Sequence, residues 1–281
     1  MIAAPSALAG QQVYRAEDTV EIEHEDRVFR LNQAVDRLGI TPRPRFNVVR
    51  VPRDRMPANF KVSVPVLRVS FSERTFFDTA QWRILPTGLR AVEAVAAAAR
   101  GEAPDVAIFV AGHTDNVGGD EYNQNLSVRR ADAVSEAMMR FGVGDVALWR
   151  VGFGESAPLY ANDSDVNRSY NRRVEFLFGA RVEPVVHVLS GQREEQVCIS
   201  SNVAESRRCL VELPARTTFV ATQATRRPIG VGGDGRVSAP VPAGGRSASS
   251  TSGPGSLASA PVPQTLTIPL HRPRTIQAPR R

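Results

Sequence analysis

The sequence predicts an α+β fold in which two amphipathic helices pack on one face of a mixed β-sheet. Three observations support this prediction. Short apolar runs of strand length alternate with longer segments of helical periodicity. Glycine and proline interrupt the chain where each helical segment should stop. The last two strand-like runs have no strong helical pattern between them, so the expected order is β-α-β-α-β-β, a two-layer sandwich.

The first strand and the first helix occupy the start of this pattern. A strand is expected at residues 62–71, where valines alternate with other residue types. The helix that follows should begin near Pro86, because proline fits the first turn of a helix. Gly101 and Pro104 should end it. Its apolar face is formed by Leu89, Val92, Val95, Ala96 and Ala99.

The second half of the pattern places a polar turn between a buried strand and a helix. Residues 106–111 are apolar and predict a buried strand, and residues 112–122 form a polar, glycine-containing turn. A helix is expected at about 123–141. Strands are expected at 146–151 and 173–178.

One charged residue lies on the apolar face of the second helix. The spacing of that face predicts that Arg130 points toward the core and that Arg129 points toward solvent. A buried guanidinium needs an anionic partner, because an unpaired buried charge is costly. The partner could be Asp115 in the preceding turn or the anion of a ligand. The face comprises Leu126, Arg130, Val134, Ala137 and Phe141.

Several motifs resemble one known family. They are Gly112-His113-Thr114-Asp115, Gly118, Asn123, Leu126-Ser127, Arg130-Ala131 and Asn171-Arg172-Arg173-Val174-Glu175. In order and in spacing they resemble the OmpA-like peptidoglycan-binding domain of porins, peptidoglycan-associated lipoproteins and flagellar stator proteins. The resemblance covers about residues 63–181 and implies an OmpA-like sandwich for that region.

The resemblance also implies a ligand, the meso-diaminopimelate of the peptidoglycan stem peptide. The free end of this amino acid is a zwitterion, so Asp115 would take its ammonium and Arg130 its carboxylate. Asn123 and Arg172 would make secondary contacts. Asp78 and Thr79 match the family's first site loop, although Ala80 follows them. The expected role is non-covalent anchoring of an envelope protein or complex; the alternative is an assembly protein that keeps the fold without binding a ligand.

The regions around this domain are harder to interpret. Residues 1–62 are expected to be an extended lead-in, with a short helix at 29–38 and a strand at 46–51. Residues 182–225 are expected to be a small β-rich appendage. Residues 226–281 are rich in Gly, Pro, Ser and Ala and are expected to be disordered. The strand-like runs of the appendage are 185–189, 209–213 and 217–221.

The positive charge of the chain is concentrated in its C-terminal tail. The net charge is +6, and residues 226–281 contain eight arginines against one acid, Asp234. The remaining residues therefore carry a net charge of −1. Such a tail favours an anionic neighbour, namely cell-wall polymer, lipid headgroups or nucleic acid, unless its basicity is incidental. It lacks aromatic residues for base stacking, so no specific nucleic-acid site is expected.

The two cysteines and the N-terminus bear on the compartment. Cys198 and Cys209 could form a disulfide in an oxidising compartment or remain free thiols in the cytosol, and the envelope resemblance favours the disulfide. Residues 1–9 end in a small-x-small pattern, typical of either the end of a signal peptide or a disordered terminus. The expected location is the periplasm or envelope of a Gram-negative bacterium, with or without association with the outer membrane.

Other classes of function find little support in the residues. No stretch approaches the roughly 20 apolar residues of a transmembrane helix. The four histidines show no paired metal-ligand spacing, so no metal site and no cofactor are expected. His113 is interpreted as structural. Nucleophile-elbow and phosphate-loop motifs are absent, so the chain is not expected to be an enzyme.

Overall fold

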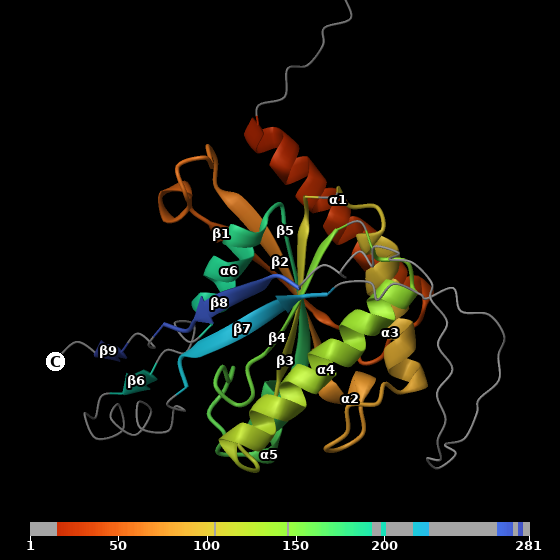
Figure 1. Cartoon of the computed structure of the whole chain (residues 1–281), viewed down its shortest axis with the longest axis vertical. Helices are drawn as coiled ribbons and strands as arrows, with labels where there is room; N and C mark the ends of the chain where they lie inside the picture. Colours follow the sequence, from red (N-terminus) through yellow and green to blue (C-terminus); the bar gives the residue numbers. More distant parts are fainter. Residues whose placement is uncertain are drawn as a thin grey trace, which may run out of the picture.

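The protein folds around one seven-stranded sheet, as the computed structural model in Figure 1 shows. The structure describes residues 16–103, 105–144, 146–192, 198–200, 216–224, 263–271 and 275–277, without the side chains of 16–18, 198–200 and 275–277. The strand order is β1-β2-β5-β3-β4-β7-β8. β3 and β4 are parallel, and the other neighbours described in this sheet are antiparallel.

The predicted β-α-β-α-β-β core is confirmed in order and in position. Its elements are β2 (Val64–Ser72), α3 (Pro86–Ala99), β3 (Ala107–His113), α4 (Asp120–Arg140), β4 (Ala147–Gly152) and β5 (Arg173–Gly179). Two short helices are added, α2 (Glu73–Phe76) directly after β2 and α5 (Asp165–Asn171) directly before β5. Ser164 caps α5, because its side chain accepts the backbone N–H of Asn167.

Helices cover both faces of the sheet (Figure 1). α3 and α4 pack on one face together with α1 (Ala16–Arg37), and α6 (Val182–Ser190) packs on the other. Side chains alternate between the faces along each strand, as in β5, where Phe176 faces the α3/α4 core and Leu177 faces α6. The α6 face is completed by Phe219 and Ile268, which are both buried.

The N-terminal region is part of the fold and not only an extended lead-in. The expected short helix is the second half of the 22-residue α1, and the expected strand is β1 (Arg45–Val51), which pairs antiparallel with β2. A buried ion pair holds α1 to the end of α3. The guanidinium of Arg27 donates to both carboxylate oxygens of Glu102, at 2.8 and 2.7 Å. A short 3-10 helix, η1 (Arg53–Arg55), follows β1.

Two expectations for the C-terminal part are wrong. Residues 185–189 were expected to form a strand but lie in α6, because tertiary packing against the sheet decides the conformation of so short an apolar run. The tail was expected to be disordered throughout, but Thr265–Pro269 form β8. This strand pairs with β7 (Thr218–Gln223), the strand predicted at 217–221, and buries Ile268 against the main sheet.

The remaining C-terminal predictions concern residues that the structure describes only in part. A separate two-stranded sheet pairs β6 (Cys198–Ser200) with β9 (Thr275–Gln277). Cys198 lies in β6, where side chains are not described, and Cys209 lies outside the described residues. The disulfide therefore stays a prediction. The run at 209–213 also lies outside the described residues.

Candidate functional site

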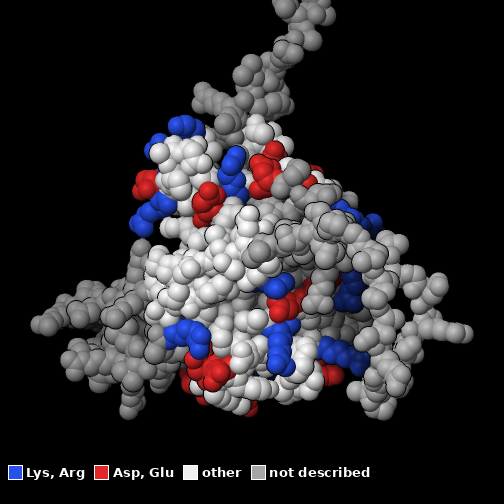
Figure 2. Space-filling view, in the orientation of Figure 1, with Lys and Arg blue, Asp and Glu red and all other residues white. Residues whose placement is uncertain are grey.

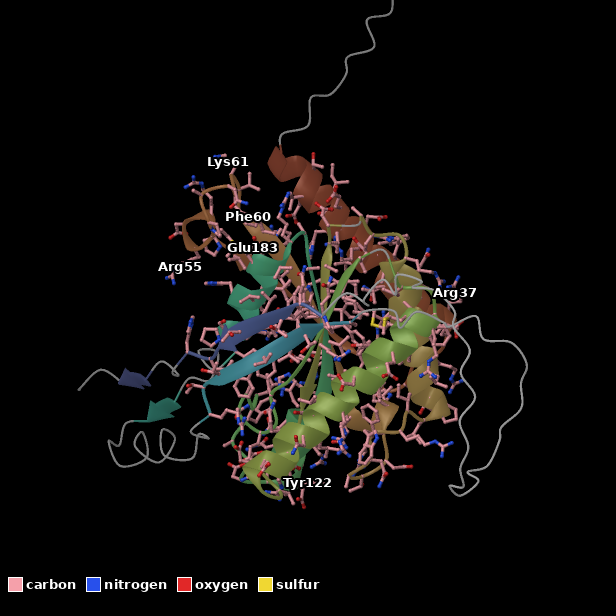
Figure 3. The ribbon with its side chains drawn as sticks, viewed as in Figure 1. Arg37, Arg55, Phe60, Lys61, Tyr122 and Glu183 are labelled. Carbon is pink, nitrogen blue, oxygen red and sulfur yellow. The ribbon has the colours of Figure 1, made fainter. Side chains whose placement is uncertain are left out.

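The candidate site lies where β3, β5 and α4 meet at one end of the sheet. Figure 1 shows α2, α5 and the first turn of α4 at this end. Figure 3 places Tyr122, in that first turn, at the opposite end of the molecule from Arg55 and Lys61. On the face drawn in Figure 2, basic and acidic side chains are interspersed, in keeping with the near-neutral charge outside the tail.

Asp115 lies in the turn that follows β3 and is 6% exposed. One of its oxygens accepts the backbone N–H of Val117 at 3.1 Å, which fixes the turn. Asn123 closes the turn from α4, because its amide donates to the carbonyl of Val117 at 3.2 Å and to Glu155 at 2.6 Å. Asp115 is thus held at the edge of the sheet, and its other oxygen accepts a hydrogen bond from the guanidinium of Arg172.

Arg130 lies on the buried face of α4, as its periodicity predicted, and is 2% exposed. Its anionic partner is Glu73 in α2, at 2.6 Å, and not Asp115. The same guanidinium donates to the carbonyl of Gln81 at 2.9 Å and lies 5.2 Å from the ring centroid of Phe77. The need for a partner was correctly predicted, but Glu73 was missed. It belongs to no periodic pattern, and only the tertiary fold brings it to Arg130.

Arg172 connects the two halves of the site. Its guanidinium pairs with Asp115 and lies 3.4 Å from the second oxygen of Glu73. The four side chains therefore alternate in sign in the order Asp115, Arg172, Glu73, Arg130, with no net charge. We call this set the four-charge network. The predicted residues Asp115, Arg130 and Arg172 are thus brought together through a residue that was not predicted.

Burial shapes the electrostatics of the network. Burial raises the pKa of Glu73, more than the neighbouring Arg130 and Arg172 lower it. Burial also lowers the pKa of Arg130, against the attraction of Glu73. In both residues the charged form is therefore stabilised by its partners and destabilised by the loss of water. A ligand charge that replaced one of these partners would enter a poorly hydrated environment.

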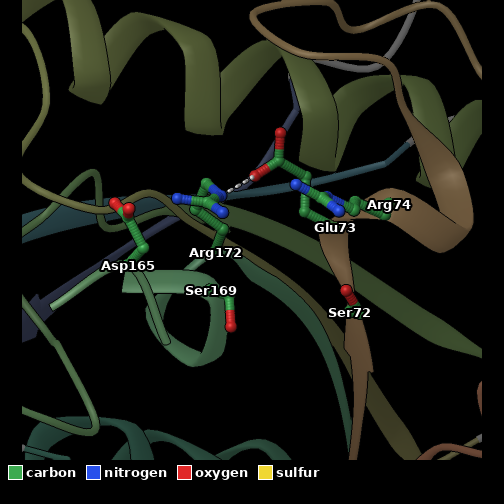
Figure 4. Close-up of a pocket in the computed structure, with 6 residues that line it drawn as sticks. All are labelled: Ser72, Glu73, Arg74, Asp165, Ser169 and Arg172. Atoms are coloured by element: carbon green, nitrogen blue, oxygen red, sulfur yellow. Dashed lines mark ion pairs between the residues drawn. The ribbon is translucent and has the colours of Figure 1, made fainter. Parts of the chain in front are cut away.

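A pocket of about 450 Å³ opens beside this network (Figure 4). Glu73 and Arg172 line it, and the dashed line in Figure 4 marks the ion pair between them. Asp115 and Arg130 lie behind that pair and do not line the pocket. The remaining lining residues are Ser72, Arg74, Asp165 and Ser169.

The first site loop contributes less directly than the resemblance implies. Asp78 and Thr79 lie exposed in a turn, followed by Ala80 at a positive φ of 59°. The contact with Arg130 comes from the backbone carbonyl of Gln81, in the same loop. The loop therefore reaches the network through its backbone, and the proposed roles of the Asp78 and Thr79 side chains stay predictions.

Most residues of the motif at 171–175 have structural roles that are separate from the network. The side chain of Asn171 accepts the N–H groups of Leu159 and Tyr160 at 2.8 and 3.0 Å, which holds the loop before α5. Arg173 faces away from the network and pairs with the fully buried Glu175 at 2.7 Å. Alternation along the start of β5 therefore leaves Arg172 as the motif residue that reaches the pocket.

A second buried ionic cluster lies around Glu175 on the α6 face. Gln192 donates to Glu175 at 2.8 Å, and His113 lies 3.5 Å from the same carboxylate. Although burial alone would raise it, Arg173 and Arg68 hold the pKa of Glu175 well below its usual value. Burial lowers the pKa of His113 to about 4. His113 stacks on Phe153, with ring centroids 5.2 Å apart, so its environment is that of a packed core residue.

Two further features are absent from the described residues. These residues contain no group of three or more His, Cys, Asp or Glu side chains that could hold a metal ion. In the same part of the chain, no helix combines the length and apolar character needed to cross a membrane.

The fold and the site together define a class of protein domain. A mixed sheet with two helices on one face presents a charged strand-end turn beside an arginine of the next helix. Residues 76–172 match the family model described as OmpA family, so this part of the chain is similar to that family.

Curated relatives match a limited part of the chain. The chain is 47% identical over 72 residues to the outer membrane porin F of Pseudomonas fluorescens, which covers 26% of this chain and 22% of that protein. It is 38% identical over 77 residues to the peptidoglycan-associated lipoprotein of Legionella pneumophila, covering 27% and 44%. The chain therefore spans less than half the length of these two relatives.

Solved structures also show a likeness to part of the chain. One is the peptidoglycan-associated lipoprotein of Burkholderia pseudomallei, at 27% identity and a TM-score of 0.34, covering 37% of this chain and 87% of that one. Another is a MotB-like protein of Desulfovibrio vulgaris, at 20% identity and a TM-score of 0.45, covering 58% and 93%.

Proposed function

We propose that this chain binds peptidoglycan non-covalently, through the meso-diaminopimelate of the stem peptide, and so anchors an envelope protein or complex to the cell wall of a Gram-negative bacterium. The OmpA-family match supports this proposal, as does the similarity to a protein named peptidoglycan-associated lipoprotein. The observation that carries it is the Arg172–Glu73 pair at the wall of the pocket, with Asp115 and Arg130 directly behind it.

The proposed binding is an exchange of ionic partners. The free end of diaminopimelate carries one ammonium and one carboxylate, so it can insert into an alternating network without changing its net charge. The ligand carboxylate would replace Glu73 as the anionic partner of the arginines. It would bind first the guanidinium of Arg172 and then that of Arg130, through paired hydrogen bonds. The carboxylates of Glu73 and Asp115, released from these arginines, would then bind the ligand ammonium. Asn123 would keep Asp115 in place by holding its turn.

Arg172 has a larger role in this scheme than the resemblance alone implied. Its side chain is 26% exposed, whereas those of Glu73 and Arg130 are 7% and 2% exposed. A ligand from solvent would therefore meet Arg172 first. Arg130 would become available only when Glu73 turns toward the ligand ammonium, so binding and rearrangement of Glu73 are coupled in this proposal.

The test is co-sedimentation of the purified chain with diaminopimelate-type peptidoglycan sacculi. We expect Asp115→Ala and Arg130→Ala to abolish co-sedimentation, because each removes one charge that the zwitterion needs. Asp54→Ala is the matched control, since Asp54 is an exposed acid in η1. Circular dichroism and a thermal midpoint should establish that each variant is folded. If both site variants sediment like the wild type, the site assignment is wrong.

A second candidate function has its own supporting observation. Arg130 is almost completely buried and already neutralised by Glu73, which favours an assembly protein that keeps the fold and no longer binds the wall. Under this alternative the wild-type chain does not sediment with sacculi. The Glu73→Gln variant, in which the carboxylate no longer competes for Arg130, would not sediment either. Under the proposed function the wild type sediments.

The proposed envelope location has an independent test. Thiol labelling of the protein from periplasmic extracts should leave Cys198 and Cys209 unmodified unless a reductant is added, because paired thiols do not react. Labelling without reductant would contradict the disulfide and weaken the assignment to an oxidising compartment.

A further inference from the structure

A second pocket of about 330 Å³ adjoins the first and lies partly outside the OmpA-family region. The two pockets share Ser72, Ser169 and Arg172 in their linings, so they are contiguous. One wall of the second pocket is formed by residues 42–45, which precede the matched residues 76–172. The other wall comes from α5, which contains Tyr170, and from the start of β5.

The charged residues that line this second pocket are all arginines, and one of them has no anionic partner among the residues that the structure describes. Arg43 is paired with Asp36, Arg173 with Glu175, and Arg172 belongs to the four-charge network. Arg45 instead lies over the ring of Tyr170, with its guanidinium carbon 4.5 Å from the ring centroid. No carboxylate of the described ranges forms an ion pair with Arg45.

The ring of Tyr170 holds this cation in place without neutralising it. Cation–π contact leaves the hydrogen-bonding edge of a guanidinium available, and that edge matches a carboxylate. Tyr170 is 40% exposed and its ring lies 5.2 Å from that of Tyr160, so a second partly exposed ring lies next to the one that contacts Arg45. The arrangement suits one carboxylate attached to a larger, partly apolar molecule.

The distance from Arg45 to Arg173, the chain neighbour of Arg172, matches a short peptide. Arg45 lies opposite Ser70 on β2, and Arg173 lies opposite Ser72 on the other side of β2. With strands about 4.8 Å apart and a rise of about 3.3 Å per residue, the Cα atoms of Arg45 and Arg173 are about 12 Å apart. An extended peptide covers this distance in about three to four residues.

We propose that Arg45, positioned by Tyr170, is a subsite for a second carboxylate of the same stem peptide whose diaminopimelate occupies the network. This inference rests on the proposed function and extends it to a residue outside the family domain. The carboxylate is either a side-branch carboxylate within the peptide or its C-terminal carboxylate. The subsite would distinguish an intact stem peptide from a free amino acid.

The test is isothermal titration of the full chain with a purified disaccharide–tetrapeptide and, separately, with free meso-diaminopimelate. We expect Arg45→Gln to weaken binding of the tetrapeptide about tenfold, the effect of losing one charge-assisted hydrogen bond. The affinity of the Arg45→Gln variant for free meso-diaminopimelate should equal that of the wild type. Arg55→Gln is the control, because Arg55 is exposed and lines neither pocket.

Amidated peptides identify which carboxylate is bound. Blocking the correct carboxylate as an amide should weaken wild-type binding about tenfold and leave Arg45→Gln unchanged. If neither amide has this effect, or if Arg45→Gln binds the tetrapeptide like the wild type, the subsite is wrong. Equal weakening of both ligands would also overturn it. If the wild type binds neither ligand, the proposed function itself is wrong and the subsite fails with it.

Discussion

Replacement of Gly112 by alanine should disturb both the fold and the candidate site. Gly112 lies in β3 directly beneath α4, and a Cβ atom there would be 2.3 Å from the backbone oxygen of Ser127. Arg130 follows Ser127 by three residues in the same helix. The glycine is therefore required for the close approach of the helix that carries Arg130.

The size of the effect follows from this distance. The gap must grow from 2.3 Å to at least 3.0 Å, so α4 must move away by about 0.7 Å or more. The obstructing atom belongs to a helix backbone and cannot rotate aside. Over-packing of this kind costs about 1–3 kcal/mol, and we expect the upper half of that range. The free energy of unfolding should fall by about 2–3 kcal/mol.

Urea unfolding followed by circular dichroism measures this change. For the typical urea dependence of about 1–3 kcal/mol per M, the midpoint of Gly112→Ala should fall by about 1 M. Gly191→Ala is the matched control, because its nearest neighbour lies at an ordinary 3.6 Å and its φ is −82°. Its change should stay within about 0.5 kcal/mol. Equal midpoints for the two variants would refute the argument from close approach.

Two further predictions concern buried charges. Glu102→Gln should lower the free energy of unfolding by about 3–5 kcal/mol, because it leaves the guanidinium of Arg27 buried without its counter-charge; a loss below about 1 kcal/mol in urea unfolding would contradict this. The buried His113 has a pKa of about 4 in the folded protein, against an ordinary 6.5. The contribution of neutral His113 to the free energy of unfolding is therefore fully present above pH 6.5 and is lost as pH falls through 4. This loss amounts to up to about 3 kcal/mol. His113→Gln should flatten this part of the stability profile, leaving a residual slope from His24, whose pKa burial also lowers; unchanged slopes would refute it.

The elements of the central fold could be predicted because each has a local signal. Helical spacing placed Arg130 on the buried face of α4, and the structure confirms that position. Apolar runs bounded by glycine and proline located β3 and the end of α3 within a few residues. These signals depend on neighbours along the chain, so one sequence is sufficient to detect them.

The site could be predicted only in part. Asp115, Arg130 and Arg172 were expected site residues because of the family resemblance, and all three belong to the four-charge network. Glu73 was not identified, because its role depends on two arginines that lie 57 and 99 positions further along the chain. For the same reason, the two candidate partners of Arg130, Asp115 and a ligand anion, did not include Glu73.

The sequence by itself determined the order of the core elements, the burial of Arg130 and the location of the charged turn, because periodicity and turn chemistry are local properties. Only the tertiary structure decided that residues 185–189 form a helix, that Thr265–Pro269 complete the main sheet, and that Glu73 links two arginines. These outcomes depend on which surfaces meet after folding. Burial against a distant strand or charge can outweigh a weak local preference.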